Sequence, residues 1–256
     1  MTTTGNGPAQ STKRRTAFRV ISTLWAASGI AFGVFTALFA VLDEGQEIHA
    51  IHNAVVTSLL LVLSAPAAVA AARAPERSTR PLVHLSAVGI AGLITMALSL
   101  TLDPFTLPLV ILVGVLWALR PSREEPIASV SPSPILLVFV AAAAGPLVAY
   151  ALGQAELQRI DDVSEHAEFF HWVETSFYAV AILLLGLLAA LRPAAHRFSG
   201  WAAGAALAVL GVASLALRGR PSGLDTGWAW AAVVGSLVFL AAVEWESRRR
   251  TRPVPG

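Results

Sequence analysis

Long apolar runs separated by short polar blocks organise this chain from end to end. A run of about 17–25 apolar residues has the length of a helix that crosses the roughly 30 Å hydrocarbon core of a bilayer. The chain contains eight such candidates, which are Ala17–Leu42, His52–Ala72, Pro81–Leu102, Phe105–Leu119, Pro134–Leu152, Phe169–Leu191, Ser199–Leu217 and Thr226–Val243. The pattern predicts an all-α, polytopic helical bundle of about eight transmembrane helices, with the lipid bilayer as its main partner.

The fourth run is the shortest of the eight. Pro104 and Pro108 stand at its start, and proline removes a helical hydrogen bond and restricts the backbone around it. A re-entrant segment or a buried half-helix is therefore the alternative interpretation of this run.

The basic residues give the bundle an orientation, because Lys and Arg beside membrane spans stay on the cytoplasmic side. With eight spans and both termini in the cytoplasm, 15 of the 18 basic residues fall on the cytoplasmic side, and the exceptions are Arg159, Arg218 and Arg220. Of the 16 acidic residues, 11 fall on the opposite side. This separation supports the count of eight spans.

Composition narrows the class of protein further. Apolar residues make up 55% of the chain and charged residues 13%, which is too apolar for an ordinary soluble domain. Cysteine is absent, so disulfides, thiolate metal sites and cysteine nucleophiles are excluded. The strong excess of arginine over lysine and the abundance of alanine favour a bacterial protein of the cytoplasmic (inner) membrane.

The two ends of the chain are short, polar and basic. Both lie directly against apolar runs, so membrane topology and anionic lipid head groups account for their charge. We predict no nucleic-acid partner, and the sequence leaves the oligomeric state open.

Two segments of the chain resemble each other at a distance of 119 positions. His52–Arg73 and His171–Arg192 each open with histidine, continue through about twenty nearly uncharged residues and close on arginine. We interpret this as a duplication that gives two parallel four-helix halves, with chance similarity between apolar helices as the alternative. The predicted boundaries are a basic tail at 1–16, a first half at 17–125, a linker at 126–133, a second half at 134–247 and a basic tail at 248–256.

Small residues and one proline suggest how the helices pack. Gly29 and Gly33, like Gly200 and Gly204, form G-x-x-x-G patterns that allow close approach between helices. We interpret both pairs as packing sites within the chain, in preference to a dimer interface. Pro66 is predicted to kink the second span.

The candidate chemistry lies at the outer ends of the second and sixth spans. His49 and His52 are three residues apart where the second span begins, and Glu168, His171 and Glu174 follow the same spacing where the sixth begins. On a continuous helix this spacing places side chains on one face. Together with Glu165 and Tyr178, the second group predicts a polar stripe along one long helix. Glu174 lies deepest, within the apolar run, where an acid is costly and is usually functional or paired.

Several kinds of site fit these five residues, His49, His52, Glu168, His171 and Glu174. Imidazole with carboxylate suits a divalent transition metal, including a di-iron or di-manganese centre, and two histidines suit haem. A proton-binding or solute-binding role also fits the same residues, and so does a polar mouth that is merely solvated.

The functional hypotheses follow from these possible sites. The leading one is a small permease or ion-handling protein with an outward-facing site for a small cation, proton or solute. The second is a membrane oxidoreductase or metalloenzyme, and the third is a non-catalytic subunit that docks through its acidic outer loop. No nucleotide-binding loop, nucleophile elbow or H-E-x-x-H motif identifies an enzyme class.

Overall fold

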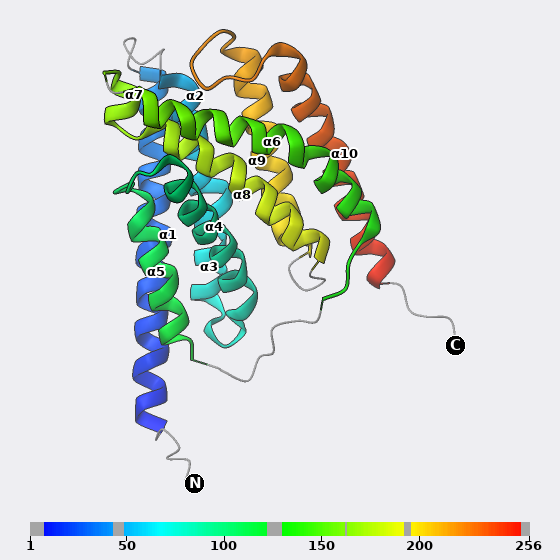
Figure 1. Cartoon of the computed structure of the whole chain (residues 1–256). Coiled ribbons are helices and arrows are strands. Elements are labelled where there is room, and N and C mark those ends of the chain that lie inside the picture. Colours follow the sequence, from blue (N-terminus) through cyan, green and yellow to red (C-terminus); the bar gives the residue numbers. More distant parts are fainter. Residues whose placement is uncertain (1–7, 43–48, 122–129, 162, 192–195, 252–256) are drawn as a thin grey trace.

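The computed structural model describes residues 8–42, 49–121, 130–161, 163–191 and 196–251. All regular structure in these ranges is helical, and the helices form one elongated bundle (Figure 1). The long helices are α1 (Pro8–Leu42), α4 (Thr79–Ser99), α6 (Pro134–Ile160), α8 (His171–Leu191), α9 (His196–Ala216) and α10 (Thr226–Thr251). The shorter elements are α2 (Ala50–Ser58), η2 (Leu59–Ser64), α3 (Ala65–Arg73), η3 (Pro75–Arg77), α5 (Thr106–Leu119) and α7 (Glu165–Glu168).

The membrane-spanning character predicted from hydropathy is confirmed. Within the described residues, 7 helical stretches are long and apolar enough to cross a membrane, and α2, η2 and α3 together form one of them. The fourth predicted span is the shorter apolar helix α5. The protein is therefore an all-α, multi-pass bundle, as the sequence predicts, while the division into two repeated halves remains a prediction.

The second span is interrupted by a wide helical turn. Residues Leu59–Ser64 are π-helical and directly precede the helical segment that contains Pro66, consistent with the disturbance expected next to a proline. His84 on α4 supports this turn: its Nε2 donates to the Leu63 carbonyl at 2.8 Å, and its Nδ1 accepts from the Ser199 hydroxyl at 3.0 Å. His84 is thus a buried histidine with both nitrogens satisfied.

Both predicted glycine pairs pack helices of the same chain. A methyl group added at Gly33 would lie 2.8 Å from Leu61 in the second span. One added at Gly204 would lie 2.6 Å from Leu240 on α10. The close approaches are therefore α1 with the second span and α9 with α10, which confirms intramolecular packing at these motifs.

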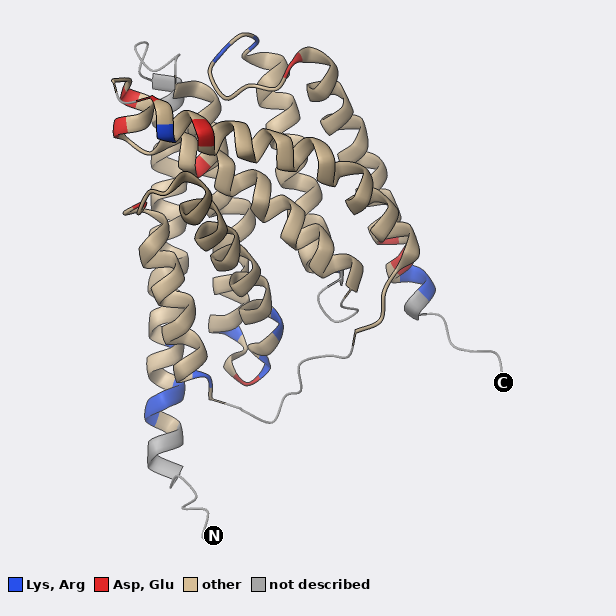
Figure 2. Cartoon of the chain, in the orientation of Figure 1, with Lys and Arg blue, Asp and Glu red and all other residues tan. Residues whose placement is uncertain are grey.

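Charge divides the bundle into two ends (Figure 2). Most blue segments lie at the start of α1, around the α3–α4 connection and at the end of α10, with others at the end of α6 and in the α9–α10 connection. Red segments gather around α7 and the end of α6, with others at the end of α10. We call the end at the start of α1 the arginine end and the end at α7, which also carries the start of α2 and of α8, the histidine end.

Candidate metal centre

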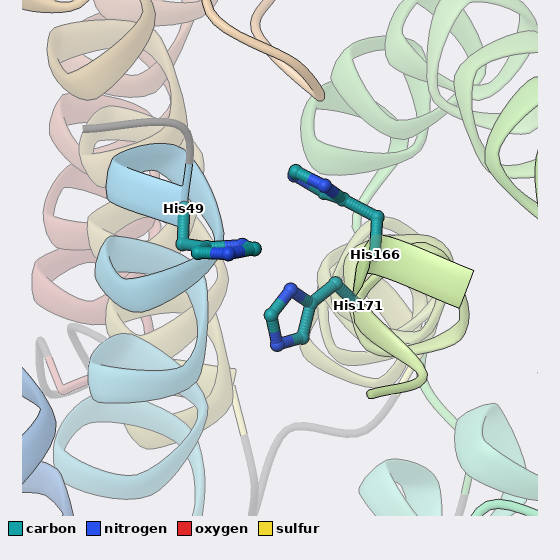
Figure 3. A group of neighbouring side chains, drawn as sticks. All are labelled: His49, His166 and His171. Atoms are coloured by element: carbon teal, nitrogen blue, oxygen red, sulfur yellow. The ribbon is translucent and has the colours of Figure 1, made fainter. Parts of the chain in front are cut away.

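Four histidines meet at the histidine end of the bundle. His49 immediately precedes α2 and His52 lies in its first turn, while His166 lies on α7 and His171 begins α8. The imidazoles of His49, His166 and His171 converge from two sides (Figure 3). The ring centroid of His49 lies 4.6 Å from the ring centroid of His166 and 4.6 Å from that of His171. The ring centroids of His166 and His171 are 5.4 Å apart.

His52 joins this group from the side facing the membrane interior. Its ring stacks on that of His171, with centroids 3.5 Å apart and planes at 22°. The two histidines thus meet in the structure, although 119 residues separate them in the chain.

A break in the backbone brings His166 to the site. Helix α7 ends at Glu168, Phe170 adopts a left-handed backbone conformation with φ of 63°, and α8 begins at His171. The predicted continuous polar stripe from Glu165 to Tyr178 is therefore wrong. On an uninterrupted helix, residues five apart point in different directions, whereas the break lets His166 and His171 face the same point.

Asp161 and Trp172 hold the short helix in place. The Asp161 carboxylate accepts hydrogen bonds from the Ser164 hydroxyl, from the Ser164 backbone N–H at 3.1 Å and from the Trp172 indole at 3.0 Å. These donors, led by the Ser164 hydroxyl, lower the pKa of Asp161 below its ordinary value. The Trp172 ring also stacks on His166 with centroids 4.7 Å apart. Asp161 thus positions His166 through Trp172 and through the start of α7.

Three of the histidines fit a metal ion. One ring nitrogen from each of His49, His166 and His171 lies within 4.8 Å of the others. In a tetrahedral zinc site with Zn–N bonds of about 2 Å, ligand nitrogens are roughly 3.3 Å apart and imidazole centres roughly 5 Å apart. The ring spacings of 4.6–5.4 Å are close to this geometry, whereas the nitrogens, within 4.8 Å of one another, would move closer together around an ion.

The pattern of hydrogen bonds also points to an ion. Among the described residues, the buried Nδ1 atoms of His49, His52 and His171 have no hydrogen-bond partner. His49 is 4% exposed and His52 is 7% exposed, so bulk water has little access to hydrogen-bond with these nitrogens. A buried polar atom without a partner is costly, and a metal ion held by the converging histidines could satisfy the lone pairs of His49 and His171.

Each histidine of the α2 segment is paired with a carboxylate. Glu165 Oε2 lies 3.2 Å from His49 Nε2, and Glu174 Oε2 lies 3.2 Å from His52 Nε2. Metal-binding histidines commonly donate their second ring N–H to a carboxylate, which fixes the tautomer and orients the ring. Glu165 is exposed, whereas Glu174 is buried inside the bundle at 7% exposure.

The five residues predicted as a site therefore separate into three groups. His49 and His171 belong to the converging set, and His52 with Glu174 forms a buried pair beside it. Glu168 is exposed, and none of the described contacts joins it to the histidines. The prediction missed His166, for which the signal was a second histidine in the same connection, five residues before His171.

The arrangement suits a small ion better than a porphyrin. Two imidazoles that ligate haem iron lie on opposite faces of the macrocycle. Here the rings contact one another directly, with centroids 3.5–5.4 Å apart. A haem would have to separate all of these contacts.

Below the histidines, hydrogen-bonded and apolar side chains fill the interior of the bundle. The Tyr178 hydroxyl donates to the Ala206 carbonyl at 2.8 Å and lies 2.6 Å from the Ser58 hydroxyl. Further along the same two spans, Leu63 and Leu185 are fully buried. The described contacts thus place the histidines at one end of the bundle, above a hydrogen-bonded tyrosine and an apolar layer.

A separate groove lies away from the histidines. It has a volume of about 480 Å³ and is bounded by α6, α8, α9 and α10, with Phe139, Leu207 and Phe239 among its mostly apolar lining. It contains none of the four clustered histidines. Its position among lipid-facing helices fits contact with the bilayer, so the groove and the histidine cluster are distinct features.

Comparisons with protein-family models, with curated proteins and with solved structures found no match for the chain. Function is therefore argued from the geometry of the cluster.

Proposed function

We propose that this protein is a multi-pass membrane metalloprotein that binds a divalent transition-metal ion through His49, His166 and His171. The observation that carries the proposal is the convergence of these three imidazoles, one nitrogen from each lying within 4.8 Å of the others. Imidazole suits zinc, copper, nickel and iron. Zinc fits best because three histidines at tetrahedral spacing are a common zinc ligand set.

We further propose that the site faces the outside of a bacterial inner membrane, with both chain termini in the cytoplasm. The separation of basic from acidic residues between the two ends supports this orientation. Acidic residues around α7 would then attract cations toward the site from outside.

A fixed metal centre is favoured over the permease suggested by the sequence. Below the cluster, the hydroxyl of Tyr178 is held by Ala206 and Ser58, and Leu63 and Leu185 fill the interior beyond them. An ion passing through the bundle would have to leave its ligands, break the Tyr178 hydrogen bonds and displace the packed leucines, which is costly in a bilayer. The metalloprotein hypothesis therefore takes precedence.

Metal binding is tested on the purified full-length protein after removal of metal with a chelator. We expect one Zn²⁺ to bind per chain, measured by calorimetry and by elemental analysis of the washed protein. His166→Ala should weaken binding by at least about a hundredfold, because removing a ligand costs at least as much as removing the outer partner of a ligand.

His196→Ala is the matched control, since His196 begins α9 at the arginine end of the bundle. It should bind zinc like the unaltered protein. Failure of the unaltered protein to retain zinc, or equal binding by both variants, would contradict the proposed function.

A further inference from the structure

His52 and Glu174 form a buried pair that the three-histidine site leaves without a role. Glu174 lies one helical turn after His171 on α8, on the same face of that helix. Its carboxylate is 3.2 Å from His52 Nε2, and the His52 ring covers one face of His171. The pair therefore lies directly beside the metal ligands, on their membrane-interior side.

His52 has two possible relations to the ion. As a fourth protein ligand, it would complete a closed tetrahedral site, the arrangement typical of structural zinc. As a neighbour only, it would leave the fourth position open, the arrangement typical of catalytic zinc. Ring geometry distinguishes these two relations.

Two imidazoles on one tetrahedral ion have ring centres roughly 5 Å apart, because each nitrogen must point at the metal. His52 and His171 are stacked nearly parallel with centroids only 3.5 Å apart. The three rings of the converging set are spaced at 4.6–5.4 Å. His52 is therefore a neighbour of the proposed metal ligand His171 and is not itself a ligand.

We propose that the metal keeps its fourth coordination position open for an external oxygen-donor ligand, and that Glu174, held by His52, accepts a hydrogen bond from that ligand. This inference rests on the proposed metal site. Solvent is the simplest such ligand, and a solvent molecule bound to a divalent metal is the nucleophile of hydrolytic reactions. The open position thus assigns the centre to water-activating chemistry.

The buried position of Glu174 fits this role. At 7% exposure, its carboxylate has few competing water molecules, and His52 Nε2 contacts only one of its two oxygens in the described structure. A hydrogen bond in such low-dielectric surroundings is stronger than one at the surface. His52 orients the carboxylate by donating to it, so His52 acts as a positioning residue.

The experiment uses the full-length protein loaded with Co²⁺, whose visible ligand-field bands report a change of ligand. Acetohydroxamate, an oxygen donor that carries N–H and O–H groups, is titrated into the unaltered protein and three variants. We expect a saturable spectral change in the unaltered protein and in His52→Ala, with cobalt affinity in His52→Ala reduced by no more than about tenfold.

Glu174→Gln should retain cobalt but bind acetohydroxamate about tenfold more weakly, the effect of losing one hydrogen bond. The exposed Glu168→Gln is the control and should behave like the unaltered protein. Equal hydroxamate affinity in Glu174→Gln and Glu168→Gln would overturn the role given to Glu174.

The remaining outcomes separate the two proposals. If cobalt binds but only His52→Ala responds to hydroxamate, His52 is the fourth ligand and the open position is overturned while metal binding stands. If cobalt binds and neither protein responds, the open position is likewise overturned. If cobalt does not bind to the unaltered protein, the proposed function itself fails.

Discussion

At the scale of single residues, the two acids of α7 offer a controlled comparison. Glu165 and Glu168 lie at the two ends of the same single turn, and both are exposed. Glu165 alone contacts a converging histidine, His49, at 3.2 Å. The two residues therefore contribute similar long-range charge but differ in whether they contact a histidine of the proposed metal site.

Glu165→Gln should lower zinc affinity by about tenfold to a hundredfold, because the carboxylate that fixes the His49 tautomer is lost. Glu168→Gln should change the affinity by much less. Isothermal titration of both variants at the same ionic strength provides the measurement. Equal losses would show that only net negative charge near the site matters.

His166 shows which part of the site a sequence can reveal. His49, His52, His171 and Glu174 stand where apolar runs begin, and regular helical spacing was enough to group them. The position of His166 depends on the left-handed backbone of Phe170. A bulky residue adopts that conformation only when its surroundings enforce it, so local spacing does not predict it.

At the scale of helices, the spans were predictable because the bilayer sets both their length and their hydropathy. The predicted Phe105–Leu119 run corresponds closely to α5 at Thr106–Leu119. The separation of α7 from α8 was not predictable, because it depends on hydrogen bonds that Asp161 makes with Ser164 and Trp172. Those contacts are local in space but involve residues without a recognisable motif.

Helix α9 approaches the backbone of α10 at a glycine outside the G-x-x-x-G pair. A methyl group at Gly211 would lie 2.8 Å from the Ala229 backbone carbonyl, whereas one at Gly235 on α10 would meet nothing within 4 Å. Gly211→Ala should destabilise the protein by about 1–3 kcal/mol, since backbone must move to relieve the overlap. Gly235→Ala should be neutral or slightly stabilising.

Thermal unfolding in one detergent compares the two glycine variants directly. A clearly lower midpoint for Gly211→Ala than for Gly235→Ala is the expected result. Similar midpoints would mean that α9 and α10 are not tightly packed at this level.

At the scale of the whole molecule, the distribution of charge and the position of the histidines are linked. Most acidic segments lie at the end that carries the cluster, and the basic segments at the ends of α1 and α10 lie at the other (Figure 2). If the basic residues face the cytoplasm, the proposed metal site would take its ion from outside the cell. The orientation of the bundle would therefore decide which pool of metal reaches the site.

Cysteine scanning tests this orientation cleanly, because the chain has no cysteine. Val163 is 91% exposed beside α7, and Ala74 is exposed after α3. Val163→Cys should react with a membrane-impermeant thiol reagent added to intact cells, and Ala74→Cys only after the membrane is opened. Labelling of Ala74→Cys in intact cells would reverse or refute the topology.

The wide turn at Leu59–Ser64 lets the second span pack against two different sets of helices. Before the turn, Ile51 and Val55 belong to the core formed with α8 and α9, whereas Ala67 and Ala68 after it belong to a second core with α1 and α4. A single added residue rotates an α-helix by about 100° beyond that point, and a π-turn absorbs such a residue. The direction in which the His52 side chain points is therefore independent of how the helices pack at the arginine end. Substitutions that reshape the α1 core should alter stability without turning the histidine away from its partners.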